Sequence, residues 1–473
     1  MAITQGNTSL IDRKTRQMMT SLPVNTSAWS FFVTDINEVG NLWLFVSSAT
    51  VHYLYHHDED SWVQIPSGAL AGTFGAGACG ARHRWSNTVT ANGGSTTTAT
   101  TTANINGLAK GKTIRILTGS QAGQQATIDD VLVLPWGTST ITFSPALPWA
   151  ISNTDTFQVA CGRFYILNAG TLAVGSFRQY DPLTGVWTTL ANTGLPATWG
   201  TDWKMVITAT GEVMSSWTAT WATSTTLTCA TKTYTADNWR NFQVRITSGT
   251  GIWQVRTITA NTATQLTVAT WTITPDVTST FEISPNEDFI YLFGNNAVTT
   301  YRYSISSNTW TTMAPTTARG GNAVAGMSAN FCGKTWDSLF DNESNCMAGR
   351  YIYSFRGSSA TLDRFDIAGG TAWAGAWAVI TYPWATETFS SWSSYWLHGH
   401  YLYIKKDATN RYFKYSITGN YIEPLSTLWY TDGAAVIWDK MWLHSYEESG
   451  TEKLLRLYNL RNTGSELHRV MIF

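Results

Sequence analysis

The sequence predicts an all-β protein in which a ring of repeated four-stranded units carries two small inserted β-domains. Three observations support this prediction. One long segment occurs twice, a weaker pattern of short apolar strands recurs along the rest of the chain, and the composition is rich in aromatic residues and threonine. β-Branched and aromatic residues favour strands over helices.

The duplicated segment is the clearest feature of the chain. The first copy contains Lys112–Gln124 and closes at Asn153–Val159, and the second contains Phe242–Gln254 and closes at Asp276–Ile283. Apolar positions, an arginine, a Thr/Ser-Gly turn and a closing Thr-Phe strand keep their order in both copies. Internal similarity of this kind indicates that one β-module was inserted twice.

Composition and charge narrow the range of partners. The chain has 473 residues, of which 13% are charged and 24 are tryptophan. That length predicts about three domains. The net charge is -1 and the pI about 6.7, so no overall basic field attracts nucleic acid, and we expect no nucleic-acid partner. A surface with little charge and much Thr and Trp suits permanent protein contacts or saccharides.

A weaker repeat becomes visible once the two copies are removed. Each unit has a short apolar strand, a strand carrying Tyr or Phe, and a strand carrying Trp or another large residue, with turns between them. A further first strand precedes several units, for example Met205–Ile207. Six units follow in order, at residues 41–65, 163–190, 288–313, 350–380, 400–425 and 440–470. Six four-stranded units of this size fit a β-propeller.

Two of the units resemble the kelch type of β-propeller, whose blades carry a Tyr before a turn and a Trp after it. Tyr180 with Trp187, and Tyr303 with Trp310, match best. The Gly-Gly pair usual in that family is absent or reduced to Gly294-Asn-Asn. The resemblance implies a six-bladed kelch-like β-propeller. We expect its Tyr and Trp side chains to pack between blades, because aromatic residues dominate buried area.

Both modules are predicted to leave the propeller between the first and second strands of a blade, in the second and third blades. They should therefore project side by side from one face. The predicted domains are an N-terminal docking arm (1–26), the propeller (27–86, 161–216 and 285–473), and module copies at 87–160 and 217–284.

The duplicated segment resembles a module common in virion proteins of tailed bacteriophages. The resemblance is carried by the two arginine-containing runs and by the closing Thr-Phe strands quoted above. In that family the module is a surface or joint element without chemistry. The resemblance implies a non-enzymatic structural virion component, such as a collar, tail-adaptor, tail-tip or capsid-bound protein. It implies contacts with other virion proteins and with copies of itself, and assembly in the host cytoplasm.

Cysteines and termini point to neither a metal site nor a membrane protein. Cys332 and Cys346 flank one loop and are candidates for a disulfide, with two separate thiols as the alternative. No CxxC or Cys/His cluster predicts zinc, and we expect neither metal nor cofactor. The first residues lack the apolar run of a signal peptide, and no stretch of about 18 apolar residues predicts a membrane span.

No set of residues predicts catalysis. Carboxylates are present, but nothing in their spacing marks a pair of the kind that glycosidases need. The alternative function is host adsorption through a receptor or surface glycan, since aromatic faces can stack on sugar rings. The candidate contacts for such a glycan or another partner are Trp373, Trp377, Trp384, Trp392 and Trp396. Packing inside a blade is the competing interpretation of this cluster.

Overall fold

The fold is all-β, and every sheet is antiparallel in the computed structural model. The structure describes residues 16–18, 31–34, 42–45, 51–56, 61–65, 74, 78–83, 85–134, 137–168, 170–171, 175–196, 198–199, 204–207, 215–234, 236–237, 239–240, 242–285, 289–293, 299–319, 351–355, 361–367, 375–381, 394–398, 401–406, 411–416, 419–425, 433–437, 440–446 and 453–459. One three-residue 3-10 helix, η1 (Gly107–Ala109), interrupts the strands in this part of the chain.

Six sheets, here numbered 1 to 6, form the main body. Sheet 1 contains β2 (Phe31–Thr34), β3 (Leu42–Phe45), β4 (Tyr53–His56) and β5 (Ser61–Gln64). Sheet 2 contains β6 (Cys79–His83), β13 (Arg163–Leu167), β15 (Phe177–Asp181) and β16 (Val186–Thr189). Sheet 3 contains β18 (Lys204–Ile207), β26 (Phe289–Phe293), β27 (Thr300–Ser304) and β28 (Thr309–Thr312).

The second half of the chain continues the series. Sheet 4 has three described strands, β29 (Tyr351–Phe355), β30 (Thr361–Asp366) and β31 (Ala376–Thr381). Sheet 5 contains β32 (Ser394–His398), β33 (Tyr401–Lys406), β34 (Arg411–Ser416) and β35 (Tyr421–Leu425). Sheet 6 contains β36 (Gly433–Ile437), β37 (Lys440–Tyr446), β38 (Lys453–Asn459) and β1 (Arg16–Met18). A separate two-stranded sheet pairs β14 (Gly170–Thr171) with β17 (Thr198–Trp199).

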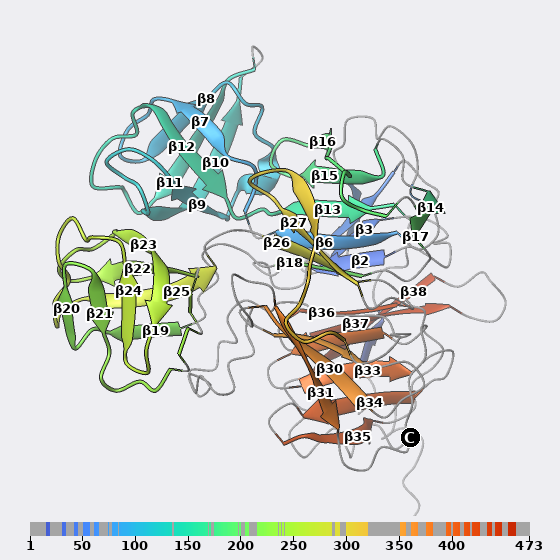
Figure 1. The fold of residues 1–473 in the computed structure, drawn as a ribbon. Helices are drawn as coiled ribbons and strands as arrows, with labels where there is room; N and C mark the ends of the chain where they lie inside the picture. The colour runs from blue at the N-terminus through green and yellow to red at the C-terminus, as the bar shows by residue number, and fades with distance from the viewer. Residues whose placement is uncertain are drawn as a thin grey trace, which may run out of the picture.

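The first strands of several sheets lie next to one another, which makes the body β-propeller-like (Figure 1). β36 contacts β2, β2 contacts β6, and β6 contacts β18, while β32 contacts β36. β13 and β26, the second strands of sheets 2 and 3, are buried along their whole length, so each is an almost continuous apolar run.

Paired aromatic residues fill the spaces between sheets, as the sequence predicted. Tyr180 and Trp187 face each other across β15 and β16, and their rings lie 4.9 Å apart. Tyr180 also lies 6.3 Å from Trp43 of sheet 1. Tyr303 pairs with Trp310 in the same way. The prediction of core packing is therefore confirmed for these four residues, which join neighbouring sheets.

Similar aromatic packing joins sheet 3 to sheet 2 and sheet 4 to sheet 3. Tyr303 of sheet 3 lies 4.8 Å from Phe177 of sheet 2. Phe365 and Trp377 of sheet 4 pair across their strands and lie 6.0 and 5.6 Å from Phe293 of sheet 3. Aromatic pairs at such separations stabilise by about 0.5–1.5 kcal/mol beyond the area they bury.

The predicted N-terminal arm of residues 1–26 is in part a strand of the main body. Arg16–Met18 form β1, which pairs with β38 near the end of the sequence. The edge of β38 presents backbone groups that a fourth strand can pair with. The rest of residues 1–26 lies outside the described residues.

The two inserted modules are separate sheets beside the main body (Figure 1). Module 1 contains β7 (Val89–Asn92), β8 (Thr98–Thr101), β9 (Thr113–Ile116), β10 (Gln125–Val133), β11 (Ser139–Ser144) and β12 (Asn153–Val159). Module 2 contains β19 (Ser215–Thr218), β20 (Trp221–Thr223), β21 (Thr226–Thr228), β22 (Phe242–Ser248), β23 (Val255–Asn261), β24 (Gln265–Val268) and β25 (Thr280–Pro285).

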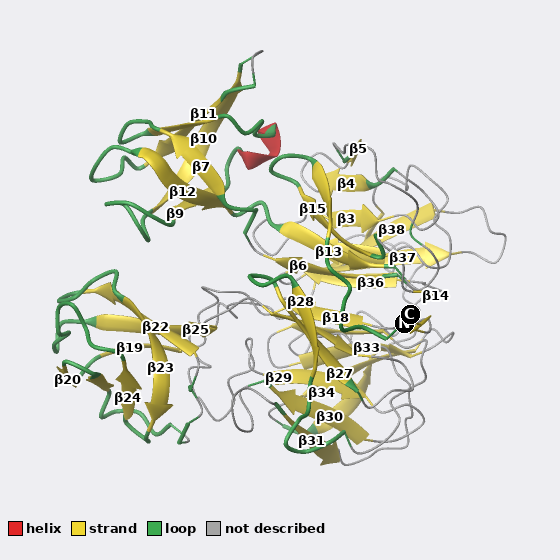
Figure 2. Cartoon of the chain, turned by 45° about the horizontal axis from the view of Figure 1, so that its top comes forward, coloured by secondary structure: helices red, strands yellow, loops and turns green. Residues whose placement is uncertain are grey.

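The modules are inserted at equivalent places, as predicted. Module 1 lies between β6 and β13, which are the first two strands of sheet 2. Module 2 lies between β18 and β26, which are the first two strands of sheet 3. Each module is thus tied to the main body by two chain crossings, and Figure 2 shows both on one side of it.

Candidate functional surface: the paired modules

The two modules have the same architecture. Their strand orders are β7-β12-β9-β10-β11-β8 and β19-β25-β22-β23-β24-β21, with β20 added at the end of the second. Arg115 of β9 lies opposite Gln158 and donates to its Oε1 at 2.9 Å. Arg245 of β22 lies opposite Glu282 and forms an ion pair with it at 2.8 Å. The arginine noticed in the duplicated sequence therefore pairs with the closing strand in both copies.

A buried polar network holds the root of module 1, which is the point where the chain enters the module, to sheet 2. The Asn87 Oδ1 accepts hydrogen bonds from Arg163 at 3.0 Å and from Gln179 at 2.9 Å. The backbone N–H of Asn87 donates to Asp181 Oδ2 at 3.3 Å, and that of Leu183 donates to Asp181 Oδ1 at 3.0 Å. Burial raises the pKa of Asp181, while these two N–H groups and the Arg163 charge lower it. The side chains on both sides of the root are thus fixed by shared partners.

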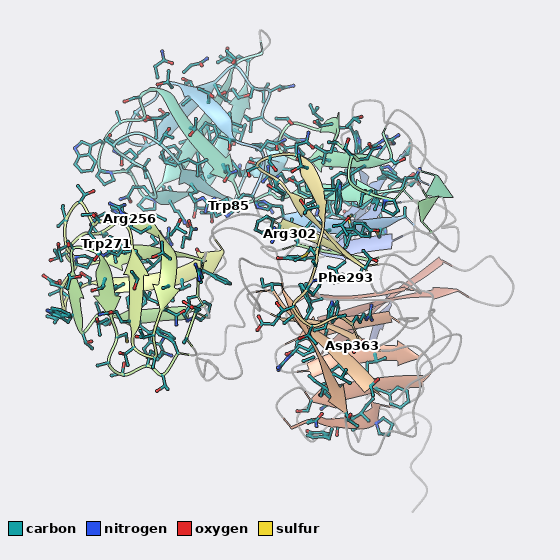
Figure 3. All side chains as sticks on the ribbon, viewed as in Figure 1. Trp85, Arg256, Trp271, Phe293, Arg302 and Asp363 are labelled. Carbon is teal, nitrogen blue, oxygen red and sulfur yellow. The ribbon has the colours of Figure 1, made fainter. Side chains whose placement is uncertain are left out.

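The turn between β15 and β16 extends into the module. The Leu183 side chain is fully buried in the core of module 1, and its carbonyl accepts from the Asn106 N–H at 2.7 Å. The Arg115 guanidinium lies 4.2 Å from the ring centre of Trp85, which is labelled in Figure 3. The buried Leu183 side chain and the polar network around Asn87 together hold module 1 to sheet 2.

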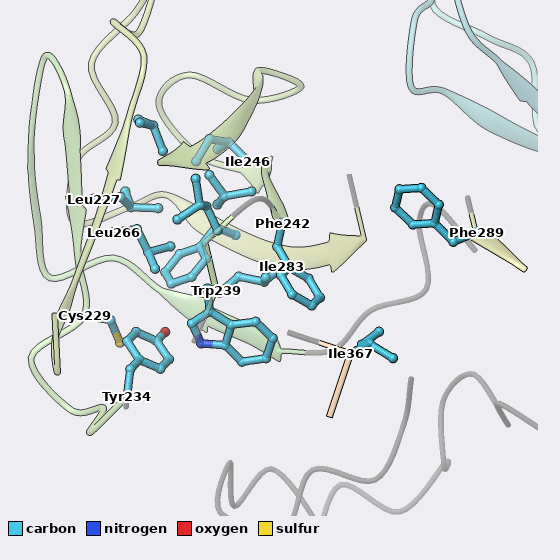
Figure 4. Close-up of a cluster of buried hydrophobic side chains, with 14 of the residues drawn as sticks. Leu227, Cys229, Tyr234, Trp239, Phe242, Ile246, Leu266, Ile283, Phe289 and Ile367 are labelled. Carbon is cyan, nitrogen blue, oxygen red and sulfur yellow. The ribbon is translucent and has the colours of Figure 1, made fainter. Parts of the chain in front are cut away.

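Module 2 has an aromatic core, and its buried side chains belong to one cluster with those of sheets 3 and 4. Trp239 packs edge-on to Phe242 at 5.2 Å and to Tyr234 at 6.3 Å, as Figure 4 shows. On the outer side, Arg256 lies 5.5 Å from the ring of Trp271, and both are labelled in Figure 3. The Arg256 guanidinium also donates to the Thr270 carbonyl at 3.0 Å. Such a core stabilises a module of this small size without a ligand.

The modules touch each other through equivalent loops. Arg115 and Arg245 are 130 positions apart, and so are Gly123 and Trp253. The Trp253 ring lies over Gly123, where an added β-carbon would be 3.0 Å from Trp253 Cε3. Both residues have positive φ, 91° for Gly123 and 72° for Trp253. A bulky residue with positive φ is strained by about 1–3 kcal/mol, and contact with the other module offsets part of this cost.

Most of the exposed large apolar side chains among the described residues lie on the modules. On module 2 all of them except Trp221 of β20 lie at the contact loop or at the neighbouring β24–β25 loop, where the Gln254 side chain donates to the Ile273 carbonyl at 2.7 Å. The exposed residues of the two modules are Leu132, Val133, Trp149, Trp221, Ile252, Trp253, Val255, Ile273 and Val277. Exposed apolar side chains gathered in this way indicate a surface for protein contacts.

The tryptophans predicted from the sequence are placed only in part. Trp377 is 4% exposed, and Arg319 lies 5.0 Å above its ring, so this residue belongs to the interior of the main body. Trp396 lies in β32, whose side chains are not described, and Trp373, Trp384 and Trp392 lie outside the described residues. Cys332 and Cys346 also lie outside them, while Cys79, Cys161 and Cys229 are buried thiols.

The described residues contain no group of three or more His, Cys, Asp or Glu side chains that could hold a metal ion. Among the same residues, no helix has the length and hydropathy needed to cross a membrane. The residues that hold the modules in place and that the sequence did not single out are Asn87, Leu183, Gly123 and Trp253. The constant offset between the copies could have paired Gly123 with Trp253, but no sequence signal showed that they meet.

Comparisons with known proteins give a distant likeness in fold. No family model matches the sequence, and no curated protein matches it. U3-55K is similar at a TM-score of 0.35 and 6% identity, over 94% of this chain and 99% of that chain. A chain of the mitotic checkpoint complex gives 0.34 and 8%, over 94% and 90%. BamB from Moraxella catarrhalis gives 0.30 and 9%, over 93% and 99%. TM-scores this low do not assign a fold, so the β-propeller-like description is based on the sheets described above.

Proposed function

We propose that this protein is a non-enzymatic structural component of a tailed-phage virion that makes protein–protein contacts in a multi-copy assembly. The observation that carries the proposal is the mounting of two copies of one module on neighbouring sheets. Each is held by two chain crossings, and the first is fixed further by the network around Asn87. The resemblance of the duplicated segment to phage virion modules supplies the setting.

We further propose that the main body is a closed ring of six kelch-like blades. Pairing of β1 with β38 supports closure, because the first strand of the chain then completes the last sheet. Contacts of β36 with β2 support it from the inner side. The Tyr-Trp and Phe-Trp pairs support the kelch-like description. A closed ring is a rigid platform because no long sheet edge is left open.

Analysis of purified particles tests the proposal. Quantitative mass spectrometry should find the chain in a fixed stoichiometric multiple relative to the major capsid protein. Accumulation in the lysate with absence from purified particles would overturn it. Binding to host glycans on an array by the purified chain, with loss of host adsorption in a Trp396→Ala particle that still incorporates the chain, would instead support the adsorption function.

A further inference from the structure

Module 1 carries a hairpin extension that module 2 lacks. Val131 opposite Ile141 in module 1 corresponds to Asn261 opposite Leu266 in module 2. In module 2 the strand pairing ends there, but in module 1 it continues to Val133 opposite Ser139. Figure 2 shows the β10–β11 hairpin rising beyond the rest of the module. We call residues 131–134 and 137–139 the ribbon.

The ribbon adds to the core of the module only at its base, where Val131 packs against the core and Ser139 is buried. Ile128 is the last buried residue of β10, and beyond it Leu132 is 57% exposed and Val133 43% exposed. In module 2 the corresponding strand ends on buried Asn261, whose Oδ1 accepts from the Trp239 N–H at 2.7 Å. Module 2 thus shows that this module fold forms with a short turn in place of the ribbon. The exposed apolar residues of the ribbon in module 1 therefore serve a purpose other than folding.

One edge of the ribbon is open for pairing. β9 pairs with β10 only from Gln125 to Thr127, and on that side the Ile128 N–H then donates to the Lys112 carbonyl and the Gly111 N–H donates to the Ile128 carbonyl, each at 2.8 Å. Within the described part of the chain, no strand pairs with Val131–Val133 on the side opposite β11. An exposed apolar edge is a template for a strand from another chain.

We propose that the ribbon pairs with the same ribbon of a second copy, antiparallel and centred on Leu132. In this register Val131 of one copy lies opposite Val133 of the other, and Leu132 lies opposite itself, so apolar side chains meet. The charges favour this arrangement over the parallel one. Asp130 then lies opposite Leu134, whereas parallel pairing would place the two Asp130 carboxylates together. The net charge of -1 adds little repulsion between copies.

Lys110 forms an exposed ion pair beside the ribbon. Its Nζ lies 3.5 Å from Asp130 Oδ1, with both side chains about two-thirds exposed. This ion pair occupies the base of the open edge. The proposed pairing deepens the multi-copy assembly proposed above and rests on it only for its biological setting. The purified full chain tests it without any particle, so failure of one proposal is distinguishable from failure of the other.

Sedimentation of the purified full chain over a range of concentrations measures the pairing. The wild-type chain should form dimers, and Leu132→Lys/Val133→Lys should weaken them at least about tenfold, because the Leu132 pair becomes two repelling charges and both Val131–Val133 pairs become contacts between a valine and a charged lysine. The matched control is Val63→Lys/Val379→Lys, which changes two exposed valines of the main body and should dimerise like wild type. A wild-type chain that stays monomeric up to about 100 µM overturns the proposal.

Cysteine cross-linking tests the register. Under mild oxidation, Leu132→Cys should form a disulfide between copies, because the two residues face each other on the twofold axis. Asp130→Cys should not cross-link above the wild-type background. Equal cross-linking at both positions would overturn the register. Ribbon-dependent binding to lipid vesicles by a chain that remains monomeric would overturn the second copy as occupant in favour of a lipid surface.

Discussion

Protonation of His52 should destabilise the protein in mildly acidic solution. The imidazole is 1% exposed and lies among aromatic rings at the boundary of sheets 1 and 2. Its ring is stacked on Phe74 at 5.2 Å, with Phe45 at 5.4 Å and Trp187 at 5.8 Å. Burial in these surroundings disfavours the charged form and lowers the pKa of His52 from 6.5 to about 4.

The direction and size of the effect follow from these two pKa values. Between pH 6.5 and pH 4 the unfolded chain binds a proton at His52 and the folded protein does not, so stability falls as the pH falls through this window. At about 1.4 kcal/mol for each pKa unit, the loss is about 3 kcal/mol and is complete near pH 4. Above pH 6.5 the group has no effect, because it is neutral in both states.

Urea unfolding followed by circular dichroism at pH 7, 5.5 and 4 measures this contribution. Buried carboxyl groups such as Asp181 also titrate with folding, so the wild-type curve must be compared with His52→Phe and His52→Leu. Both variants should lose about 3 kcal/mol less than the wild type between pH 7 and pH 4. Two substitutions at His52 are compared so that poor packing of either one does not decide the result. A wild-type loss equal to that of both variants would refute the reasoning.

Three further predictions concern buried contacts. Asp363→Asn should destabilise the protein by about 3–5 kcal/mol in urea unfolding, because the buried charge of Arg319, 3.0 Å away with both side chains 1% exposed, loses its carboxylate partner; an Arg319→Met/Asp363→Leu double variant should recover most of this loss. Asn87→Ala should cost about 2–3 kcal/mol and accelerate proteolysis at the root of module 1, because two buried donors lose their acceptor; unchanged protease resistance would count against the network. Trp253→Gly should relieve the backbone strain and remove the contact with Gly123. The distribution of distances between spin labels on β10 and β23 should therefore broaden. An unchanged distribution would show that the contact does not hold the modules together.

Local sequence pattern was sufficient to predict most of the strands and their partners. Tyr180 and Trp187 are separated by a Gly-containing turn, so their strands form a hairpin and their rings meet across it. The same reasoning gave the pair Tyr303 and Trp310. It also placed the two modules between the first and second strands of neighbouring sheets. These features depend on residues close in sequence or on a visible repeat.

The sequence by itself therefore determined an all-β chain, its aromatic cross-strand pairs and the insertion of one module twice, because period-two alternation, turn residues and internal similarity are local signals. Only the tertiary structure decided that β1 joins β38, that Leu183 fills the core of module 1, and that Trp253 lies on Gly123. Each of these contacts joins segments distant in sequence, and their formation depends on how whole sheets are placed, which no short pattern of residues encodes.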